Sequence, residues 1–277
     1  MADIYGSHFE FGGITSRQYG LVIANLNTSR WTQLSGSSHG ITIYNRNANR
    51  KYLIDDDYSD SPITFDIDIV TEGGRTLEVA EKRQIEKWLF NCRNYRRLYF
   101  DSADDLTGET YEFVNGIVVR NYLNCRFINP ERIEGNGGTV GYKVSLEADS
   151  NMFWQDEVVK EFSVNNGASD ISTTVVVDVD TDFYDYIYPK VTITVGSVGG
   201  NITVVNNSDD SSRQTTFVGM SPYSSVVMKG ELNYVSGDYY SKFSGRNFIR
   251  LLDGENKFMV LGDIDKIKFE YAARRMM

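Results

Sequence analysis

Apolar and polar residues alternate most regularly at residues 63–69, which read Ile-Thr-Phe-Asp-Ile-Asp-Ile. Successive side chains of a β-strand point to opposite sides, so the four apolar residues share one face and Thr64, Asp66 and Asp68 share the other. We predict a strand with one face in a hydrophobic core and the other in water.

One segment has the spacing of an amphipathic helix, residues 76–92, directly after the breaker Gly73-Gly74. Charged residues fill its other side, with Glu78 and Lys82 at the favourable i,i+4 spacing. We predict one helix that packs on a sheet through Leu77, Ile85, Trp88, Leu89 and Cys92.

Short extended segments bounded by turn residues surround this helix. Before it, a strand and a tight Gly-Gly turn are expected at 3–14, a strand at 19–23, and a long hairpin or arm in the Asn- and Arg-rich stretch 25–60. After it, the predicted strands are 97–100, 110–114, 117–120, 124–128 and 141–148, with hairpin turns at 114–117 and 134–138.

A second series of strands begins after a polar stretch that follows Trp154. Turn signals separate these strands every 8 to 12 residues or so, the spacing of a sandwich or barrel. The predicted strands are 173–179, 188–195, 201–205, 214–218, 224–229, 248–252, 257–261 and 266–271. At roughly 150 residues per domain, the sequence predicts two domains, residues 1–155 and 165–277, with the boundary between about 150 and 168.

Charge and hydropathy exclude two classes of partner. The 28 basic and 38 acidic residues give a net charge of −10, which repels phosphate backbones and disfavours specific nucleic-acid binding. No apolar run approaches the ~18 to 20 residues that span a bilayer, and the start lacks a basic region followed by an apolar stretch. We expect neither membrane insertion nor a secretory signal.

Histidine and cysteine occur only twice each, which restricts the available chemistry. Catalytic triads need a histidine base, and zinc sites and disulfide scaffolds need more ligands or cysteines than this chain has. We expect Cys92 and Cys125 to be small buried thiols and His8 and His39 to be surface or hydrogen-bonded residues. No catalytic residue, metal site or cofactor is expected, whereas the 18 tyrosines suit β-strands and protein interfaces.

Asp178, Asp180 and Asp182 alternate as at the start of a calcium loop, but Phe183 and Pro189 occupy the positions of the required Gly and Glu. The pattern instead predicts a strand with its valines inward and its carboxylates outward.

Other short motifs have simpler readings. The glycines at 12–13 and 135–138 lack the Lys-Ser/Thr of a phosphate loop and are expected in turns. Arg96 and Arg97 follow the predicted helix. Cations are stabilised near the C-terminal end of a helix dipole, and we prefer this interpretation to a phosphate-binding site.

Residues 9–23, Phe-Glu-Phe-Gly-Gly-Ile-Thr-Ser-Arg-Gln-Tyr-Gly-Leu-Val-Ile, resemble the opening of the distal tail protein (Dit) family of long-tailed, siphovirus-type bacteriophages. The order of later pieces agrees with that family: the 63–69 strand, the helix ending in Trp88-Leu89, Leu98-Tyr99-Phe100 and the 142–153 strand. Beyond them, Asn165-Asn166-Gly167, Tyr188 to Ile193 and Leu251 to Asn256 are similar to its C-terminal domain. The long arm at 25–60 departs from the family pattern.

This resemblance implies a mainly β fold, with an N-terminal β-sandwich or split-barrel domain carrying one amphipathic α-helix, followed by a galectin-like C-terminal β-sandwich. It implies a homo-hexameric ring that joins the tail tube protein to tail-tip hub, receptor-binding or baseplate proteins and lets DNA pass. The expected location is the virion tail tip, after assembly in the host cytoplasm.

For such a ring, we hypothesise that Asp55, Asp56 and Asp57 line or rim the lumen, where carboxylates repel DNA. The competing interpretation of this cluster is an ordinary solvated acidic loop, because it has no matching base for catalysis.

Two other function classes remain open from the sequence. A carbohydrate-binding, lectin-like module could use tyrosines as platforms, although all three tryptophans lie in the first 154 residues. Its candidate platforms are Tyr186, Tyr188, Tyr239 and Tyr240. An enzyme such as a cell-wall hydrolase is disfavoured by the histidine and cysteine counts.

Overall fold

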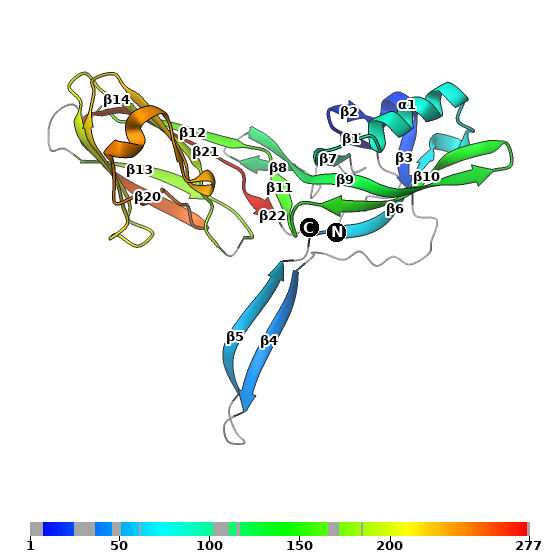
Figure 1. Cartoon of the computed structure of the whole chain (residues 1–277), viewed down its shortest axis with the longest axis horizontal. Coiled ribbons are helices and arrows are strands. Elements are labelled where there is room, and N and C mark those ends of the chain that lie inside the picture. Colours follow the sequence, from blue (N-terminus) through cyan, green and yellow to red (C-terminus); the bar gives the residue numbers. More distant parts are fainter. Residues whose placement is uncertain are drawn as a thin grey trace. The chain divides into compact units, whose positions relative to one another are not determined.

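The chain forms two compact units, residues Met1–Gln155 with Arg275–Met277, and residues Asp156–Arg274 (Figure 1). The computed structural model describes residues 8–24, 37–45, 51–60, 62–101, 111–114, 117–165, 172–183 and 185–275. Of residues 37–45, 51–60, 111–114 and 117–118 it describes the backbone alone. The predicted mainly β architecture with an amphipathic α-helix is confirmed.

The first unit is built on one antiparallel sheet with the strand order β2-β1-β7-β9-β10-β6-β3. Two further strands pair with β9 outside this order: β8, and β11, which also pairs with β22. The elements are β1 (His8–Phe11), β2 (Ile14–Thr15), η1 (Ser16–Tyr19), β3 (Leu21–Ala24), β6 (Thr64–Thr71), η2 (Glu72–Gly74), α1 (Val79–Leu89), β7 (Arg96–Asp101), β8 (Tyr111–Val114), β9 (Ile117–Gly135), β10 (Gly138–Ala148), β11 (Phe153–Gln155) and β22 (Arg274–Arg275).

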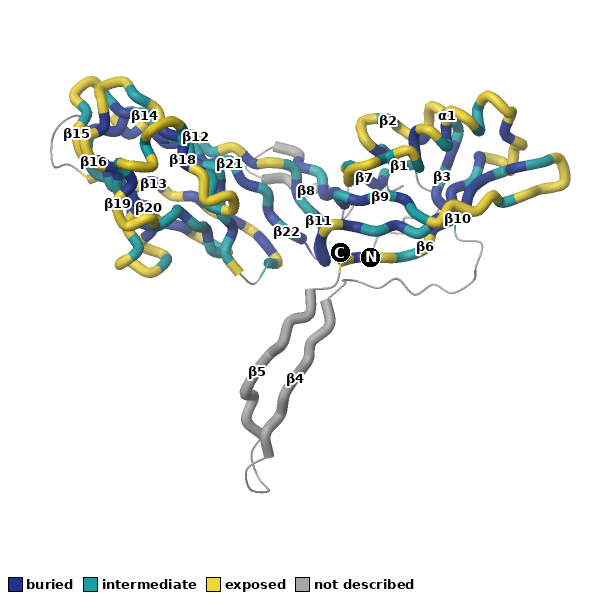
Figure 2. Tube along the Cα trace, in the orientation of Figure 1, coloured by how far each residue is buried: buried dark blue, intermediate teal, exposed yellow. Residues whose placement is uncertain are grey.

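Helix α1 covers the apolar face of this sheet through Trp88. The indole ring stacks on Phe9 and Tyr19, with centroids 5.8 and 5.3 Å apart. Its N–H donates to the carbonyl oxygen of Phe11 at 2.9 Å. Buried residues alternate with exposed ones along the strands beneath it (Figure 2), which places one continuous core between helix and sheet.

The helix is shorter than predicted at both ends. It does not start at Thr76, because Glu78 is still extended, with φ −69° and ψ 159°, and the N–H of Leu77 donates to the carbonyl of Thr139 in β10. It begins instead after Glu78, which forms a capping box with Glu81. Gly73 and Gly74 have φ of 66° and 72°, values that favour glycine, so the predicted breaker is confirmed.

The alternating strand at residues 63–69 is confirmed as part of β6, with one correction. Asp68, predicted to face water, is only 7% exposed. Strand β6 is an interior strand: Asp68 lies opposite Lys143 of β10 on one side and opposite Ala24 of β3 on the other. The strands on both sides, β10 and β3, therefore shield Asp68 from water, whereas an edge strand would leave this position exposed.

Both predicted hairpin turns are present, between β8 and β9 and between β9 and β10. The two short strands predicted at 117–120 and 124–128 are one strand of 19 residues. The polar pair Asn121 and Asn124 breaks the apolar pattern without breaking the strand, and Asn121 is buried at 3% exposure.

The arm predicted at residues 25–60 contains a long hairpin. Strands β4 (Ser37–Asn45) and β5 (Lys51–Asp60) pair with each other and form a separate two-stranded sheet. A register shift between Thr42 and Ile43 marks an irregularity in the pairing.

The second unit is a β-sandwich of two five-stranded antiparallel sheets, β12-β21-β14-β17-β18 and β13-β20-β15-β16-β19. Phe258 of one sheet and Phe269 of the other meet with centroids 4.8 Å apart. The elements are β12 (Val158–Ser163), β13 (Ser172–Val179), β14 (Lys190–Val195), β15 (Gly200–Asn206), β16 (Gln214–Met220), β17 (Ser225–Lys229), η3 (Gly230–Leu232), β18 (Tyr234–Val235), η4 (Gly237–Lys242), β19 (Phe243–Ser244), β20 (Gly254–Leu261) and β21 (Ile264–Tyr271).

Two sequence predictions for this unit were wrong. Residues 248–252 form no strand apart from one isolated bridge, between Ile187 and Leu251. Residues 158–163, predicted as a polar boundary, form β12, which pairs with β21 along its whole length. The strand at Asp178 is confirmed, because Val175, Val177 and Val179 are buried and Asp178 is exposed.

We predict that residues 156–274 fold as an isolated fragment and that residues 165–274 form a clearly less stable one. Without β12, the interior strand β21 becomes an edge, and Phe269 loses its contact with Phe162, at 6.2 Å between centroids. We expect urea unfolding to give a free energy lower by roughly 3 kcal/mol for the shorter fragment. Equal stabilities would contradict the role of β12, and failure of the longer fragment to fold would contradict independent domains.

Candidate functional site

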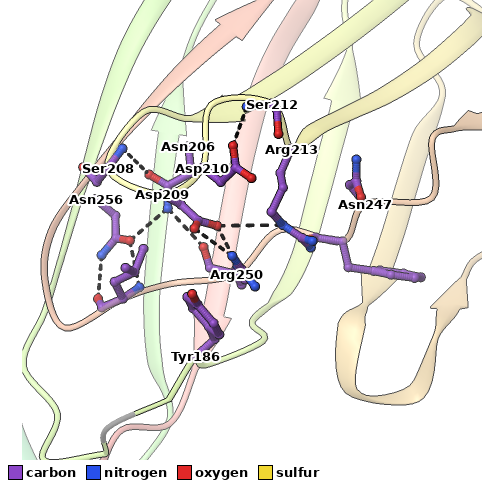
Figure 3. A network of polar contacts seen from close by, with 12 residues as sticks. Tyr186, Asn206, Ser208, Asp209, Asp210, Ser212, Arg213, Asn247, Arg250 and Asn256 are labelled. Carbon is purple, nitrogen blue, oxygen red and sulfur yellow. Dashed lines mark hydrogen bonds and ion pairs between the residues drawn. The ribbon is translucent and has the colours of Figure 1, made fainter.

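The second unit holds a dense network of polar side chains around Asp209 and Arg250 (Figure 3). The guanidinium of Arg250 donates to both carboxylate oxygens of Asp209, at 2.6 and 2.8 Å. Arg213 lies 3.9 Å from the same carboxylate. The guanidinium of Arg250 also lies over the ring of Tyr186, 3.5 Å from its centroid.

This ion pair is well shielded, because the side chains of Arg250 and Asp209 are 15% and 7% exposed. The hydrogen bond from Arg250 holds the pKa of Asp209 below its ordinary value, and the same contact raises the pKa of Arg250. Asp209 is therefore a permanent anion that binds a permanent cation, which suits a structural link and not proton transfer.

Asn206 and Asn256 extend the network into the segment before β20. The amide of Asn206 donates to the carbonyl of Arg250 and to the side-chain oxygen of Asn256, at 3.1 and 2.9 Å. Asn256 is fully buried and bonds to the backbone of Leu252 and Gly254. These bonds satisfy the backbone of residues 250–254, which explains why this predicted strand needs no sheet partner.

The network also bears on the tyrosines proposed as sugar platforms. The ring of Tyr186 is covered by Arg250, while Lys242 and Arg246 lie 5.8 and 5.1 Å from the ring centroids of Tyr239 and Tyr240. Tyr188 packs against Gly230. Arg250 therefore covers one face of Tyr186, whereas Tyr240 remains 41% exposed.

In the first unit, arginines cover tyrosines on the sheet face opposite α1. Arg120 lies over Tyr99 at 3.8 Å and Arg97 over Tyr122 at 4.6 Å, and the two tyrosine rings meet at 5.4 Å. Glu10 accepts a hydrogen bond from Arg120 at 3.1 Å. Both tyrosines are buried although they lie on the face away from the core.

The predicted helix-dipole role is confirmed for Arg96, whose guanidinium donates to the carbonyl of Trp88 in the last turn of α1 at 3.5 Å. Cys125 is buried as predicted, and burial raises its pKa well above the ordinary value. Cys92 is half-buried, with a pKa raised by the same cause.

His8 is hydrogen-bonded, as expected, to the carbonyl of Leu21 and to Glu72. His39 lies in strand β4, and its side chain is outside the described part of the protein, so its predicted role stays a prediction.

Asp55, Asp56 and Asp57 lie in strand β5, not in a loop, opposite Thr42, Ile41 and Gly40 of β4. Their side chains are outside the described residues, so their place relative to a lumen stays a prediction. The described residues contain no group of three or more His, Cys, Asp or Glu side chains arranged to hold a metal ion. Within the same ranges, no helix has the length and apolarity to cross a membrane.

Sequence reasoning missed the network around Asp209 and Arg250. This part of the sequence was interpreted only as strands and turn signals, and no local pattern links Asp209 to a residue 41 positions later. The pairing exists only because the sandwich brings the two loops together.

Solved structures that share this fold come from phage tails. The Dit protein of phage SPP1, described as a paradigm of the hub adsorption apparatus, superposes with a TM-score of 0.60 at 9% identity over 97% of this chain and 99% of that one. A chain of the phage P2 baseplate in its activated conformation with Ca matches with a TM-score of 0.53 at 9% identity, over 98% and 99% of the two chains. The P2 baseplate with Sr gives the same score at 10% identity.

Family models cover both units of the chain. Residues 4–150 match the phage tail protein N-terminal domain, and residues 154–271 match the phage tail C-terminal domain. No curated protein matches the sequence. Together the two models span nearly all of the 277 residues, and the chain therefore belongs to this family of phage tail proteins.

Proposed function

We propose that this protein is a distal tail protein, a structural subunit of the phage tail tip that joins the tail tube to the baseplate or receptor-binding apparatus. The observation that carries the proposal is the shared fold over 97% of this chain and 99% of the SPP1 Dit protein, whose solved structure is described as a hub. A match across both units supports the same role for the whole chain, because a single shared domain could serve many functions.

The proposed assembly is a homo-hexameric ring through which DNA passes. Its partners would be the tail tube protein on one side and tail-tip hub, receptor-binding or baseplate proteins on the other. The ring would assemble in the host cytoplasm and remain at the tip of the tail in the virion.

A non-enzymatic role is supported by membership of a family of phage tail proteins. Hydrogen bonds from Tyr95 and Arg126 lower the pKa of Glu147. Burial alone would raise the pKa of Glu270, but Lys190 and Lys268 more than offset it and hold that pKa below its ordinary value. Both carboxylates therefore act as anions within ion pairs and hydrogen bonds of their own unit. Neither the family models nor the solved structures support the lectin-like alternative.

We expect the purified protein to have a mass in solution six times the 31.4 kDa of the chain. Light scattering after size-exclusion chromatography measures this directly. A closed heterologous ring is required because a tail channel must be continuous, which a face-to-face dimer does not provide. A monomer or dimer at all concentrations tested, and no ring in electron micrographs of the tail tip, would contradict the proposal.

Deleting the arm should yield folded monomers, because we assign to the β4–β5 hairpin the contact with the neighbouring subunit. Ala24 lies opposite Asp68 in the β3–β6 pair, so about eight Gly/Ser residues in place of 26–61 can bridge back to the start of β6. Circular dichroism would confirm the fold and light scattering the mass. A linker variant that still forms complete rings would show that the arm is not the contact.

Replacing Asp55, Asp56 and Asp57 together with Lys should slow DNA release from assembled particles and leave folding largely intact. Cations at a lumen wall would hold the phosphate backbone that carboxylates repel. A matched control replaces Glu231, Asp238 and Glu255, three exposed acidic residues of the second unit, with Lys. Both triple variants therefore change the net charge equally. Equal release rates for the two triple variants would contradict the lumen placement.

A further inference from the structure

The two ends of the first sheet meet at His8. In the order β2-β1-β7-β9-β10-β6-β3, strands β1 and β3 belong to opposite ends, and no backbone ladder joins them. Instead, Nδ1 of His8 in β1 lies 3.0 Å from the carbonyl oxygen of Leu21 in β3. Side-chain contacts of His8 therefore join β1 and β3, which backbone pairing leaves unconnected; we call this junction between β1 and β3 the seam.

Glu72 provides a second acceptor for the same ring. Its carboxylate lies 2.9 Å from Nε2 of His8, whose side chain is 15% exposed. The N–H of Glu72 donates to the carbonyl of Gly20, so the backbone of Glu72 is held beside the start of β3, while its side chain is 56% exposed. His8 thus spans from β1 to two separate points on the β3 side of the seam.

A neutral imidazole cannot satisfy both contacts, because it carries one N–H and one lone pair. If Nδ1 holds the proton, the lone pair of Nε2 faces the Glu72 carboxylate. If Nε2 holds it, the lone pair of Nδ1 faces the Leu21 carbonyl, with the Ser16 hydroxyl at 3.4 Å as its nearest donor. The imidazolium donates to both acceptors and also carries the charge that pairs with Glu72.

Other groups around the seam belong to η1 and β7. Ser16 accepts a hydrogen bond from the N–H of Phe9 at 3.0 Å and is fully buried. Asp101 lies opposite His8 in the β1–β7 ladder and pairs with Arg17 at 3.7 Å. The charged groups around His8 are therefore Glu72, Asp101 and Arg17, which sum to one negative charge.

We propose that His8 is a proton-dependent latch that holds the first sheet closed between β1 and β3. With the proton bound, the imidazolium ties β1 to Leu21 and Glu72. When the proton leaves, one of the two contacts becomes repulsive and the seam loosens around residues 8–24. The latch is a property of one subunit and is independent of ring formation.

Hydrogen exchange of the full-length protein at pH 5.5 and 8.5, on either side of the range in which imidazoles titrate, tests the latch. After correction for intrinsic exchange rates, amides of residues 8–24 should exchange several-fold faster at pH 8.5 in the wild type. H39Q, which changes the other histidine, should behave like the wild type. E72Q should remove the pH dependence, because a glutamine amide can face a neutral imidazole.

The thermal midpoint gives a second readout. Raising the pH from 5.5 to 8.5 should lower the Tm of the wild type by about 2–4 °C more than that of H8Q, as expected for one charge-assisted contact in a domain of this size. If H8Q does not fold, nitrogen NMR of the wild type decides, because both His8 nitrogens should be protonated at pH 5.5. A singly protonated His8 at that pH, or equal pH effects in the wild type and E72Q, would overturn the proposal.

Discussion

The first unit depends on the burial of Trp88 between helix and sheet. This side chain stacks on Phe9 and Tyr19, and its N–H donates to the backbone carbonyl of Phe11 in β1. Loss of such a side chain typically costs about 3–5 kcal/mol, because a cavity remains. One residue therefore fixes the position of α1 and of the strand that begins the fold.

The second unit depends on polar side chains, because residues 250–254 of its sandwich are irregular. Residues 250–254 have few backbone partners in a sheet, and Asn206, Asn256 and the ion pair of Asp209 with Arg250 replace them. A shielded ion pair is stabilising only when its geometry is good. Here the contact uses both carboxylate oxygens, and the ring of Tyr186 covers the guanidinium.

In each unit, charged side chains pair with partners of the same unit. Arg120 binds Glu10 and covers Tyr99, and Lys190 binds Glu270, so these charges serve architecture. The function that agrees with such a molecule is assembly by contact, and membership of the phage tail family is consistent with it. His8 differs from these residues, because both of its ring nitrogens face an acceptor, the Leu21 carbonyl and the Glu72 carboxylate.

Local patterns in the sequence determined much of the fold. Alternation predicted the strand at 63–69, glycines predicted both hairpins around β9, and helical spacing predicted the face that carries Trp88. These features depend on neighbours a few residues apart, which one sequence displays directly.

Tertiary structure decided what depends on distant partners. Asp68 is buried because strands flank it on both sides, β12 forms because β21 offers a free edge, and residues 248–252 leave the sheet because Asn256 binds them. The pairs Asp209–Arg250 and His8–Glu72 join residues 41 and 64 positions apart. No periodicity of the sequence predicts such pairs, because they form only after strand pairing and register bring distant segments together.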